Sequence, residues 1–376
     1  MTILATDNAP SDKRFSAKRA TEVECPRCLF TNSIAVIGKN QCEYCDLHDT
    51  LSYQSNPDNL YREIDRIKKD GEGKQYDCLI GISGGLDSSL LLYLSVVKFK
   101  LRPLVIHFDN GFNNSQAESN MKNLINHLSV NSITYRLDST EYMDLNIAFL
   151  KAGVRDADIP NDIAMTKLMY QTADFYGIKW ILNGHDFRTE GSTPKGWTYM
   201  DAKYIQSIYT QFTGKKLKNY PLFTFKDQII YGLKGIKQIR PFHYILGRHK
   251  IEYRMKEAIN WQEYGGKHCE NIYTEYVGAK LLPEKFNIDK RLVYLSAQVR
   301  SGVMSKSEAK LIMQIPPRFD MNKLGELRYR IEEAAQSEKQ DRSNFKKYNF
   351  KKYRIIVYLL MKLKIVPYTF YVKYCK

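Results

Sequence analysis

The middle of the chain alternates between short apolar runs and longer amphipathic segments. Short apolar runs bounded by turn residues are typical of buried strands, and apolar residues at helical spacing indicate helices packed on one side. The predicted strands cover residues 76–82, 102–109, 132–137 and 179–183, and the predicted helices cover residues 90–97, 115–128 and 161–176. Repeated strand–helix–strand spacing predicts an α/β fold, a doubly wound parallel sheet with helices on both faces.

The pattern differs on either side of this block. Residues 59–70 show helical spacing and lead into it, and from about residue 200 the alternation fades. Helical segments with interleaved aromatic and basic side chains then follow at residues 204–212, 226–233, 250–260 and 306–313. The sequence therefore predicts three parts: residues 1–58, a polar arm and a small cysteine-containing module; residues 59–200, the alternating domain; and residues 201–376, a mainly helical substrate or partner domain.

The most specific motif lies at the first strand–helix junction and reads Ser83-Gly84-Gly85-Leu86-Asp87-Ser88-Ser89. Glycines let the backbone approach a ligand closely, and the free N–H groups at a helix start favour an anion. A carboxylate among phosphates is explained if Asp87 holds a Mg²⁺ ion. The alternative is an ordinary capped helix after a glycine turn. The predicted nucleotide contacts here are Ser83, Gly84, Gly85, Asp87, Ser88 and Ser89.

Two further strand ends carry candidate site residues. Ligands of a doubly wound sheet bind outside the carboxyl ends of its strands. Asp109 ends the second strand and Gly184 follows the fourth, so both are expected near the nucleotide. His185 comes next, and it either contacts phosphate or metal as part of the catalytic machinery or is a packing residue. Glu190, in the same loop, suits a sugar or phosphate site and is a candidate substrate contact.

Two Cys-x-x-Cys pairs precede the alternating block. Cys25 and Cys28 form the first pair and Cys42 and Cys45 the second, a spacing typical of a zinc ribbon. Four thiolates make a closed tetrahedral site, so the predicted metal is structural. Disulfides and an iron–sulfur cluster are the alternatives. With four thiolates available, His48 is expected to be a surface residue and not a ligand.

A glycine pair followed by Lys267 and His268 forms a plausible second anion clamp. Lys290 and Arg291 add two positive charges further along. From local sequence alone a basic surface loop explains these residues as well. As site residues, Lys267 is a candidate catalytic cation, able to hold a leaving pyrophosphate, and His268, Lys290 and Arg291 are candidate substrate contacts.

The composition adds a strong positive charge. The chain has 57 Lys and Arg against 41 Asp and Glu, a formal net charge of +16. Such a balance implies acidic partners such as nucleotides, nucleotide sugars or nucleic acid, without choosing among them. Residues 1–20 are polar and predict a surface arm without a signal sequence. No run approaches the length of a membrane span, so a cytoplasmic protein is expected.

Basic and apolar stretches alternate along the last fifty residues. Two interpretations fit this pattern. A docked terminal helix is the favoured one, and a contact with a membrane surface is the other.

The motif at residues 83–89 resembles the PP-loop of the N-type ATP pyrophosphatases. These enzymes cleave ATP between the α and β phosphates and adenylate an oxygen of their substrate. The loop is not of the Walker A type, because the chain has no GxxxxGK[ST]. The resemblance implies ATP and Mg²⁺ as cofactors.

Further segments resemble the N-acetyl sugar amidotransferase family, which includes WbpG- and PseA-type enzymes of lipopolysaccharide O-antigen and flagellin-sugar pathways. They read Tyr-Gly-Gly-Lys-His-x-Glu, Leu-Pro-x-Lys-Phe-x-Ile-Asp-Lys-Arg and Leu-Ser-x-x-Val-x-Ser-Gly, beside the paired Cys-x-x-Cys motifs and the Gly-His element. The resemblance spans roughly residues 21–320. It implies a fold of the adenine nucleotide α-hydrolase type, whereas Zn²⁺ in the ribbon is predicted from the spacing of the cysteines.

The same resemblance implies an activity and partners. The activity is ATP-dependent conversion of an acetamido group of a UDP-N-acetyl sugar to an acetamidino group, through an adenylated intermediate and ammonia. A separate glutaminase and a cyclase-like barrel are expected to supply the ammonia, and no nucleic acid is expected as partner.

The alternative from another class is a PP-loop tRNA-modifying enzyme of the thiolation type. Such enzymes also carry zinc ribbons and basic surfaces, but they need a further cysteine pair or an iron–sulfur cluster to deliver sulfur. Cys78, Cys269 and Cys375 are scattered, which argues against that chemistry. A nucleotide-binding regulator without catalysis would lack Asp87 or the serines, and they are present.

Overall fold

A computed structural model describes residues 22–375, so the polar arm predicted for residues 1–20 lies outside the described part. Its centre is a five-stranded sheet in the order β3-β2-β1-β4-β5, with every neighbouring pair parallel. The strands are β1 (Cys78–Ile82), β2 (Pro103–Asp109), β3 (Ser132–Arg136), β4 (Trp180–Leu182) and β5 (Lys237–Ile239). The predicted α/β fold class with a parallel sheet is confirmed.

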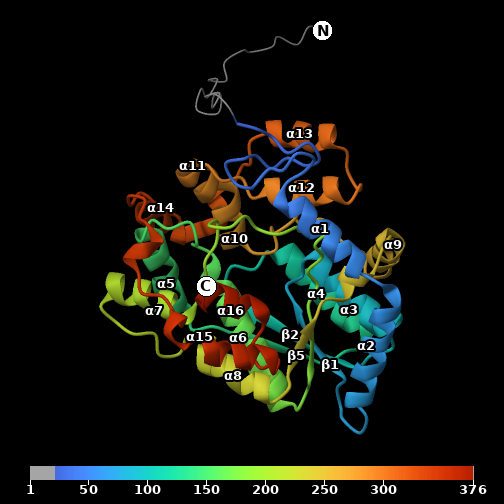
Figure 1. The fold of residues 1–376 in the computed structure, drawn as a ribbon. Coiled ribbons are helices and arrows are strands. Elements are labelled where there is room, and N and C mark those ends of the chain that lie inside the picture. Colours follow the sequence, from blue (N-terminus) through green and yellow to red (C-terminus); the bar gives the residue numbers. More distant parts are fainter. Residues whose placement is uncertain (1–21, 376) are drawn as a thin grey trace, which may run out of the picture.

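Helices surround the sheet and make up most of the chain after it (Figure 1). The first eight are α1 (Glu43–Gln54), α2 (Pro57–Asp70), α3 (Leu86–Val97), α4 (Ser115–Leu128), α5 (Ser139–Lys151), α6 (Ile159–Phe175), α7 (Ala202–Thr213) and α8 (Phe225–Leu233). The others are α9 (His249–Ala258), α10 (Ile272–Tyr276), α11 (Leu282–Phe286), α12 (Arg291–Arg300), α13 (Lys306–Gln314), α14 (Arg328–Ala335), α15 (Arg354–Lys362) and α16 (Tyr368–Cys375). The helical C-terminal region is thus also confirmed.

The two faces of the sheet are covered by different helices. Successive strand residues point to opposite faces. Ile80 and Ile82 of β1 therefore pack with side chains of α2, α3, α4 and α9. Leu79 of β1 and Ile181 of β4 pack on the other face with side chains of α6 and α8. This double covering explains why the central strands are apolar along their whole length.

The strand order reverses between β1 and β4, which lie side by side in parallel. In sheets of this kind the crevice outside the carboxyl ends of the strands at the reversal is the usual ligand site. The loop after β1 contains the Ser83–Ser89 motif, and the loop after β4 begins with Asn183 and Gly184. The topology therefore brings these two loops to the same edge.

Several elements have no counterpart among the predicted ones, and β5 and α5 were missed for opposite reasons. Lys237 and Gln238 of β5 are exposed at the edge of the sheet, so this strand lacks an apolar pattern. Helix α5 has buried residues on all its sides and therefore lacks a polar stripe. Because β5 lies beyond residue 200, the sheet is not confined to residues 59–200. The predicted domain boundary itself stays a prediction.

The largest apolar core lies beside the sheet and joins α5, α7, α10 and α14. Helices α15 and α16 pack through buried Val357 and Tyr374 against Phe225 and Ile229 of α8. The last helices are therefore docked, as the favoured interpretation expected. Among the described residues, none of the helices combines the length and the apolar character that a membrane crossing requires.

The cysteine-containing segment packs against helices from the far end of the chain (Figure 1). Val293 of α12 lies in the same apolar cluster as the four cysteines. Lys306, at the start of α13, pairs with Glu24 at 2.6 Å and donates to the carbonyl oxygen of Cys25 at 2.6 Å. The N-terminal module is thus part of one body with the C-terminal helices.

Candidate active site

The Ser83–Ser89 loop joins β1 to α3 in a conformation that requires glycine. Gly84 has φ +82°, and a Cβ atom there would lie 2.2 Å from the carbonyl oxygen of Ala117 in α4. Gly85 is the N-cap of α3 in extended conformation. The loop therefore lies directly on α4, and the start of α3 points its N–H groups toward the crevice.

The serine hydroxyls of the loop differ in their positions. Ser88 Oγ donates to the carbonyl oxygen of Gly85 at 3.0 Å, and Ser83 Oγ accepts from the N–H of Gly85 at 3.2 Å. These two hydroxyls lie 3.3 Å apart. Ser89 is different, because its side chain is fully buried and its Oγ has no hydrogen-bond partner among the described residues. The hydroxyl contact predicted for Ser89 is therefore not available in this conformation.

Asp87 is the centre of the site. Its Oδ2 accepts from Lys267 Nζ at 2.9 Å, and its Oδ1 pairs with Arg248 Nη2 at 2.8 Å. Burial alone would raise the pKa of Asp87, but the Lys267 ammonium and the Arg248 guanidinium outweigh it and hold that pKa below its usual value. Asp87 is therefore ionised at neutral pH.

Glu190 completes a charged cluster with Asp87. Its Oε1 lies 3.6 Å from Lys267 Nζ, and its Oε2 lies 4.0 Å from His185 Nε2. Burial raises the pKa of Glu190 to about 8, against the pull of Lys267. The carboxyl group is thus largely protonated at neutral pH while Asp87 beside it is not.

The Gly184–Gly191 loop is fixed against the PP-loop-like turn. A Cβ atom on Gly184 would lie 3.2 Å from the carbonyl oxygen of Asp87. His185 Nε2 is 3.2 Å from the carbonyl oxygen of Gly191 and its Nδ1 is 3.3 Å from His243 Nε2. Since burial lowers the pKa of His185 to about 4, the ring is neutral and donates through Nε2. In this conformation His185 holds its own loop in place.

Two arginines at this edge were missed by the sequence reasoning. Arg248 pairs with Asp87, donates to Thr189 Oγ1 at 3.1 Å and lies over the Phe242 ring at 4.7 Å. Arg240 directly follows β5 and interacts electrostatically with Glu190. Neither residue belongs to a recognisable motif in a chain with many basic residues. Arg240 could have been found from its position after a strand, but that strand, β5, was not predicted.

The stretch from Tyr264 to Glu270 covers the loop from the other side. Leu86 donates its backbone N–H to Tyr264 Oη at 3.1 Å. A Cβ atom on Gly85 would lie 3.1 Å from Glu270 Oε1, so this carboxyl group lies directly against the loop. Lys267 lies between these two contacts in sequence and reaches Asp87. The predicted second clamp and the glycine loop are therefore one site.

The electrostatic balance of the cluster favours an anion. Four cations face four carboxyl groups, and burial raises the pKa values of Glu190 and Glu270. The cations are Arg188, Arg240, Arg248 and Lys267, and the carboxyl groups are those of Asp87, Asp186, Glu190 and Glu270. A proton on Glu190, which burial favours, gives the cluster a net positive charge that suits a phosphate-bearing ligand.

Asp109 lies at the carboxyl end of β2, as predicted, but its charge is already paired. Its Oδ2 accepts from Arg136 Nε at 2.9 Å and its Oδ1 accepts from the N–H of Gly111 at 3.0 Å. The neighbouring Asn110 is buried and donates to Asn161 Oδ1 at 2.8 Å. Asp109 thus shapes its own turn, and its predicted nucleotide contact stays a prediction.

The other predicted substrate contacts lie in different surroundings. Lys290 pairs with Asp158 at 2.6 Å, at the start of α6. His268 follows Lys267, is exposed and has φ +64°. Arg291 is held by Asp289 of its own turn at 2.6 Å and donates to the carbonyl oxygen of Ile312 at 3.3 Å. These contacts connect α12 to α13 and lie outside the Asp87 cluster.

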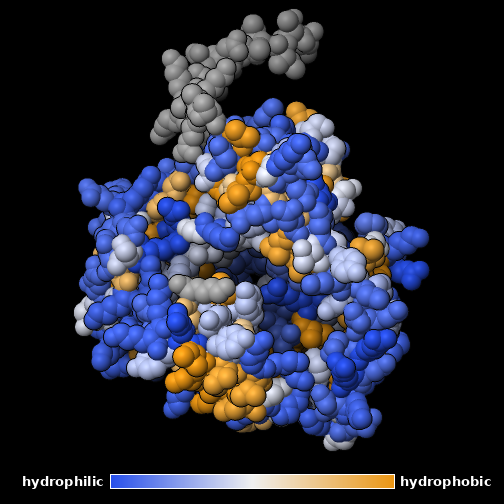
Figure 2. All heavy atoms as spheres, in the orientation of Figure 1, coloured by the Kyte–Doolittle hydropathy of each residue, from blue (hydrophilic) through white to orange (hydrophobic). Residues whose placement is uncertain are grey.

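A hollow opens near the centre of the face drawn in Figure 2. In the orientation of Figure 1, helices α1, α10 and α16 lie around it.

The four cysteines meet at one buried point. Their Sγ atoms all lie within 4.8 Å of one another. Three sulfur-to-sulfur distances are 3.8 Å (Cys25–Cys45), 3.7 Å (Cys28–Cys42) and 3.6 Å (Cys42–Cys45). A tetrahedron of thiolates around one ion with bonds of about 2.3 Å has edges of about 3.8 Å. The cluster could therefore hold a single metal ion.

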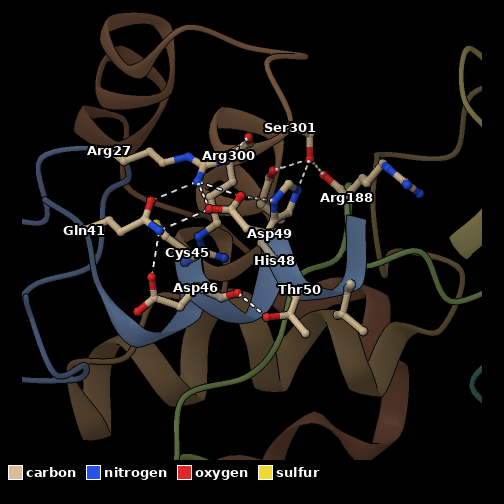
Figure 3. Close-up of polar contacts among 12 residues, drawn as sticks. Arg27, Gln41, Cys45, Asp46, His48, Asp49, Thr50, Arg188, Arg300 and Ser301 are labelled. Atoms are coloured by element: carbon tan, nitrogen blue, oxygen red, sulfur yellow. Dashed lines mark hydrogen bonds and ion pairs between the residues drawn. The ribbon is translucent and has the colours of Figure 1, made fainter. Parts of the chain in front are cut away.

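Polar contacts connect this cysteine module to the active-site loop (Figure 3). His48 is buried, contrary to the expected surface position, and its Nε2 lies 3.1 Å from Ser301 Oγ. Ser301 Oγ lies 2.9 Å from the carbonyl oxygen of Arg188. Arg27 donates to Asp49 at 2.7 Å and to the carbonyl oxygen of Arg300 at 3.0 Å. His48 was misjudged because its partner lies 253 residues away.

Comparison with known proteins gives one domain match and one relative that aligns with most of the chain. Residues 270–363 match the family model described as the C-terminal domain of WbpG-like lipopolysaccharide biosynthesis proteins. The uncharacterized protein MJ1599 of Methanocaldococcus jannaschii is 24% identical over 303 residues, which cover 78% of this chain and 94% of that protein.

Three solved structures resemble parts of the chain weakly. They are an NMN synthetase from Francisella tularensis (15% identity, TM-score 0.27, covering 55% of this chain and 93% of that one), an NH3-dependent NAD synthetase from Campylobacter jejuni (14%, 0.28, 55% and 94%) and the U34-tRNA thiolase NcsA from Methanococcus maripaludis (11%, 0.29, 87% and 100%). The domain match bears out the resemblance of the C-terminal motifs: residues 270–363 are similar to the C-terminal domain of WbpG-like lipopolysaccharide biosynthesis proteins.

Proposed function

We propose that the chain is an ATP-dependent PP-loop enzyme, an amidotransferase that converts an N-acetyl group of a nucleotide-activated sugar to an acetamidino group. The pathway would be lipopolysaccharide O-antigen or related surface-glycan biosynthesis. One observation carries the proposal. Asp87 of the glycine loop is paired with Lys267, which lies three residues before the start of the WbpG-like match at residue 270. The ATP-loop motif and the family-specific segment therefore form a single site.

The chemistry begins with an unreactive carbonyl. An acetamide has a poorly electrophilic carbon and a poor leaving group. If its oxygen attacks the α-phosphorus of ATP, pyrophosphate leaves and an O-adenylated imidate forms. Ammonia then adds to the imidate carbon and AMP departs with the former carbonyl oxygen. An amidine remains, and no enzyme nucleophile is needed.

The side chains around Asp87 suit the first step. The site must place the α-phosphate in line with the acyl oxygen and neutralise the departing pyrophosphate. Arg248 and Lys267 supply positive charge at the start of α3, where free N–H groups also favour an anion. Glu190, with a pKa raised to about 8 by burial, can hold a proton near the reacting groups.

Two metals belong to this proposal. Asp87 and Glu190 offer oxygen ligands, which Mg²⁺ prefers, and bound Mg²⁺ would add positive charge beside the phosphates. Both carboxylate oxygens of Asp87 are paired with cations here, so Mg²⁺ could bind Asp87 only if the ion pair with Arg248 or with Lys267 were broken. In the N-terminal module the thiolate ligands and single-ion geometry suit Zn²⁺. Its role would be structural.

Ammonia supply is the part of the proposal that involves partners. Ammonia is mostly protonated at neutral pH, so a local source is useful. We propose that a separate glutaminase and a cyclase-like barrel provide it. Co-purification of the chain with such proteins, and glutamine-dependent turnover in their presence only, would support this arrangement.

The competing tRNA-thiolation function has weaker support. Sulfur delivery needs either an iron–sulfur cluster or reactive thiolates near the ATP site, and the second route can be examined from the remaining cysteines. Cys269 is the candidate closest in sequence to Lys267, but burial raises the pKa of its thiol to about 11. Cys78 is fully buried in β1. Neither thiol is suited to carry sulfur at neutral pH.

Mass spectrometry can test the proposal directly. Purified protein would be incubated with ATP, Mg²⁺, ammonium and a panel of UDP-N-acetyl sugars. We expect one sugar to undergo the small mass decrease that replacement of oxygen by NH produces, together with AMP and pyrophosphate. Omission of ATP is the control. Pyrophosphate release triggered by tRNA and not by any sugar nucleotide would instead favour the thiolation function.

A further inference from the structure

The C-terminal hairpin formed by α15 and α16 exposes an unusual number of large apolar side chains. Ile355 is 71% exposed, Ile356 57%, Leu359 55% and Leu363 70%. Val357 of the same helix is only 2% exposed and anchors it to the rest of the molecule. One side of α15 thus packs against the rest of the molecule, and its solvent-facing side is also apolar.

The exposed aliphatic residues form a single stripe. At about 100° per residue, the positions 355, 356, 359 and 363 fall within roughly 100° of arc, and Val357 lies away from them. Figure 2 shows apolar side chains gathered in the region of α15 and the neighbouring α8, whose Leu233 is 67% exposed. Contiguous exposed apolar surface of this kind usually marks an interaction site.

The charge around the stripe has one sign. From Lys346 to Cys375 the sequence has eight Lys and Arg residues and no acidic residue. Both ends of α15 are flanked by exposed cations. They are Lys351, Lys352 and Arg354 at its start and Lys362 and Lys364 at its end. Half of the formal net charge of +16 therefore comes from 30 residues.

We propose that this hairpin binds the surface of an anionic lipid bilayer. A cationic helix with outward Ile and Leu side chains can bury its apolar stripe at the headgroup boundary while its Lys and Arg residues contact anionic lipids. A nucleic acid would engage the cations, but it offers nothing to four exposed aliphatic side chains. The aliphatic stripe and the single-signed charge together fit a bilayer, which supplies both an apolar phase and negative charge.

The surface contributes no side chain to the charged cluster around Asp87. Residues 346–375 contribute none of the groups that contact Asp87, Lys267 or Glu190. Binding to a membrane would therefore hold the enzyme at a membrane surface without changing the site. The inference does not depend on the proposed reaction.

Vesicle co-sedimentation of the full chain tests this inference. We expect binding to vesicles that contain phosphatidylglycerol, much weaker binding to pure phosphatidylcholine vesicles, and a decrease with salt. The double variant Ile355→Glu/Leu359→Glu should lower the partition coefficient at least tenfold. Lys351→Glu/Lys352→Glu should lower it severalfold. ATP cleavage in the absence of vesicles should be unchanged in both.

The chain offers a matched control on α13. Leu311 and Ile315 are 61% and 66% exposed and have the same four-residue spacing as Ile355 and Leu359. Leu311→Glu/Ile315→Glu should bind vesicles like the parent protein. Should the glutamate pair on α15 prevent folding, Ile355→Ser/Leu359→Ser replaces it, with the thermal midpoint as the check.

Three results would overturn the inference. One is an absence of binding to phosphatidylglycerol vesicles. Another is equal loss of binding in the α13 control. The third is a stable dimer of the parent protein that Ile355→Glu/Leu359→Glu converts to monomers, because a second copy would then cover the stripe.

Discussion

The cysteine module and the Asp87 cluster are both compact groups of functional side chains, but they are assembled in opposite ways. The four cysteines come from a segment of 21 residues, Cys25 to Cys45, and face one another in a closed, buried site. The Asp87 cluster gathers side chains from the loops after β1 and β4, from the start of α9 and from the Tyr264–Glu270 stretch. This cluster lies at the edge of the sheet that the carboxyl ends of the strands form.

This difference separates a structural site from a reactive one. A closed set of thiolates around a metal ion leaves no position for a substrate, so the role that we propose for it is structural. The Asp87 cluster holds opposite charges in unequal states of protonation, since Asp87 is ionised and burial raises the pKa of Glu190 to about 8. Carboxyl groups with pKa values pushed apart are typical of sites that move protons or bind phosphate.

The sharpest test of this contrast is Asp87→Asn, which should remove the activity and leave the metal site intact. Loss of the carboxylate leaves Lys267 and Arg248 without their shared partner and removes a ligand for Mg²⁺. We expect AMP and pyrophosphate formation to fall about a thousandfold. Metal content per chain should stay at the value of the parent protein.

Asp65→Asn is the matched control for that change, because Asp65 is an exposed carboxylate on α2. It should leave the rate unchanged. If Asp87→Asn retained pyrophosphate release at the parent rate, the assignment of Asp87 would be wrong.

The reciprocal test is Cys25→Ser. The parent protein should carry one zinc ion per chain, and the variant should lose it. Metal binding and local folding are coupled, so the unfolding free energy should fall by more than about 3 kcal/mol. Activity at low temperature should fall far less than in Asp87→Asn. Metal analysis that finds no zinc, or finds iron, would contradict the structural-zinc assignment.

Arg248 tests whether a residue outside the recognised motifs belongs to the site. Arg248→Ala should lower the rate about a hundredfold, because a cation beside developing phosphate charge is lost. Arg248→Lys keeps the charge but not the planar fork that reaches Asp87 and Thr189 together, so it should recover only part of the rate. Equal rates in the alanine variant and the parent would exclude Arg248 from the site.

The smallest expected effect concerns the pH dependence of stability. The pKa of Glu190 rises from 4.5 to about 8 on folding, so the folded state holds this proton more tightly. The unfolding free energy therefore decreases as pH rises from about 4.5 to about 8. Glu190→Gln cannot titrate, and its stability should decrease less over that window, by on the order of 1–2 kcal/mol. Parallel stability profiles for the two proteins would show that the pKa is not raised.

The sequence predicted those parts of the molecule that have a local signature. The Cys-x-x-Cys pairs, the glycine loop and the buried strands follow from spacing within a few residues, and each lies where expected. The burial of Ser89 was not foreseen, because helical geometry turns this side chain into the core; its nucleotide contact stays a prediction.

Parts that depend on distant partners were not predictable in the same way. Arg248 pairs with Asp87, which lies 161 residues earlier in the sequence. His48 contacts Ser301, the residue that follows α12. Strand β5 has only three residues, two of them exposed, so its own sequence does not indicate a strand. It forms through parallel pairing with β4. Lys267 was found because the resemblance of its segment to a family supplied long-range information that periodicity lacks.

The central claim is that the acetamido oxygen of a nucleotide sugar attacks the α-phosphorus of ATP at the Asp87 site. An isotope experiment tests it most directly. The acetamido carbonyl of the UDP-N-acetyl sugar that supports turnover would carry heavy oxygen, and the AMP formed would be analysed by mass spectrometry. The account predicts that each AMP carries one heavy oxygen atom, in step with formation of the amidine. Unlabelled AMP accompanying amidine formation would contradict it.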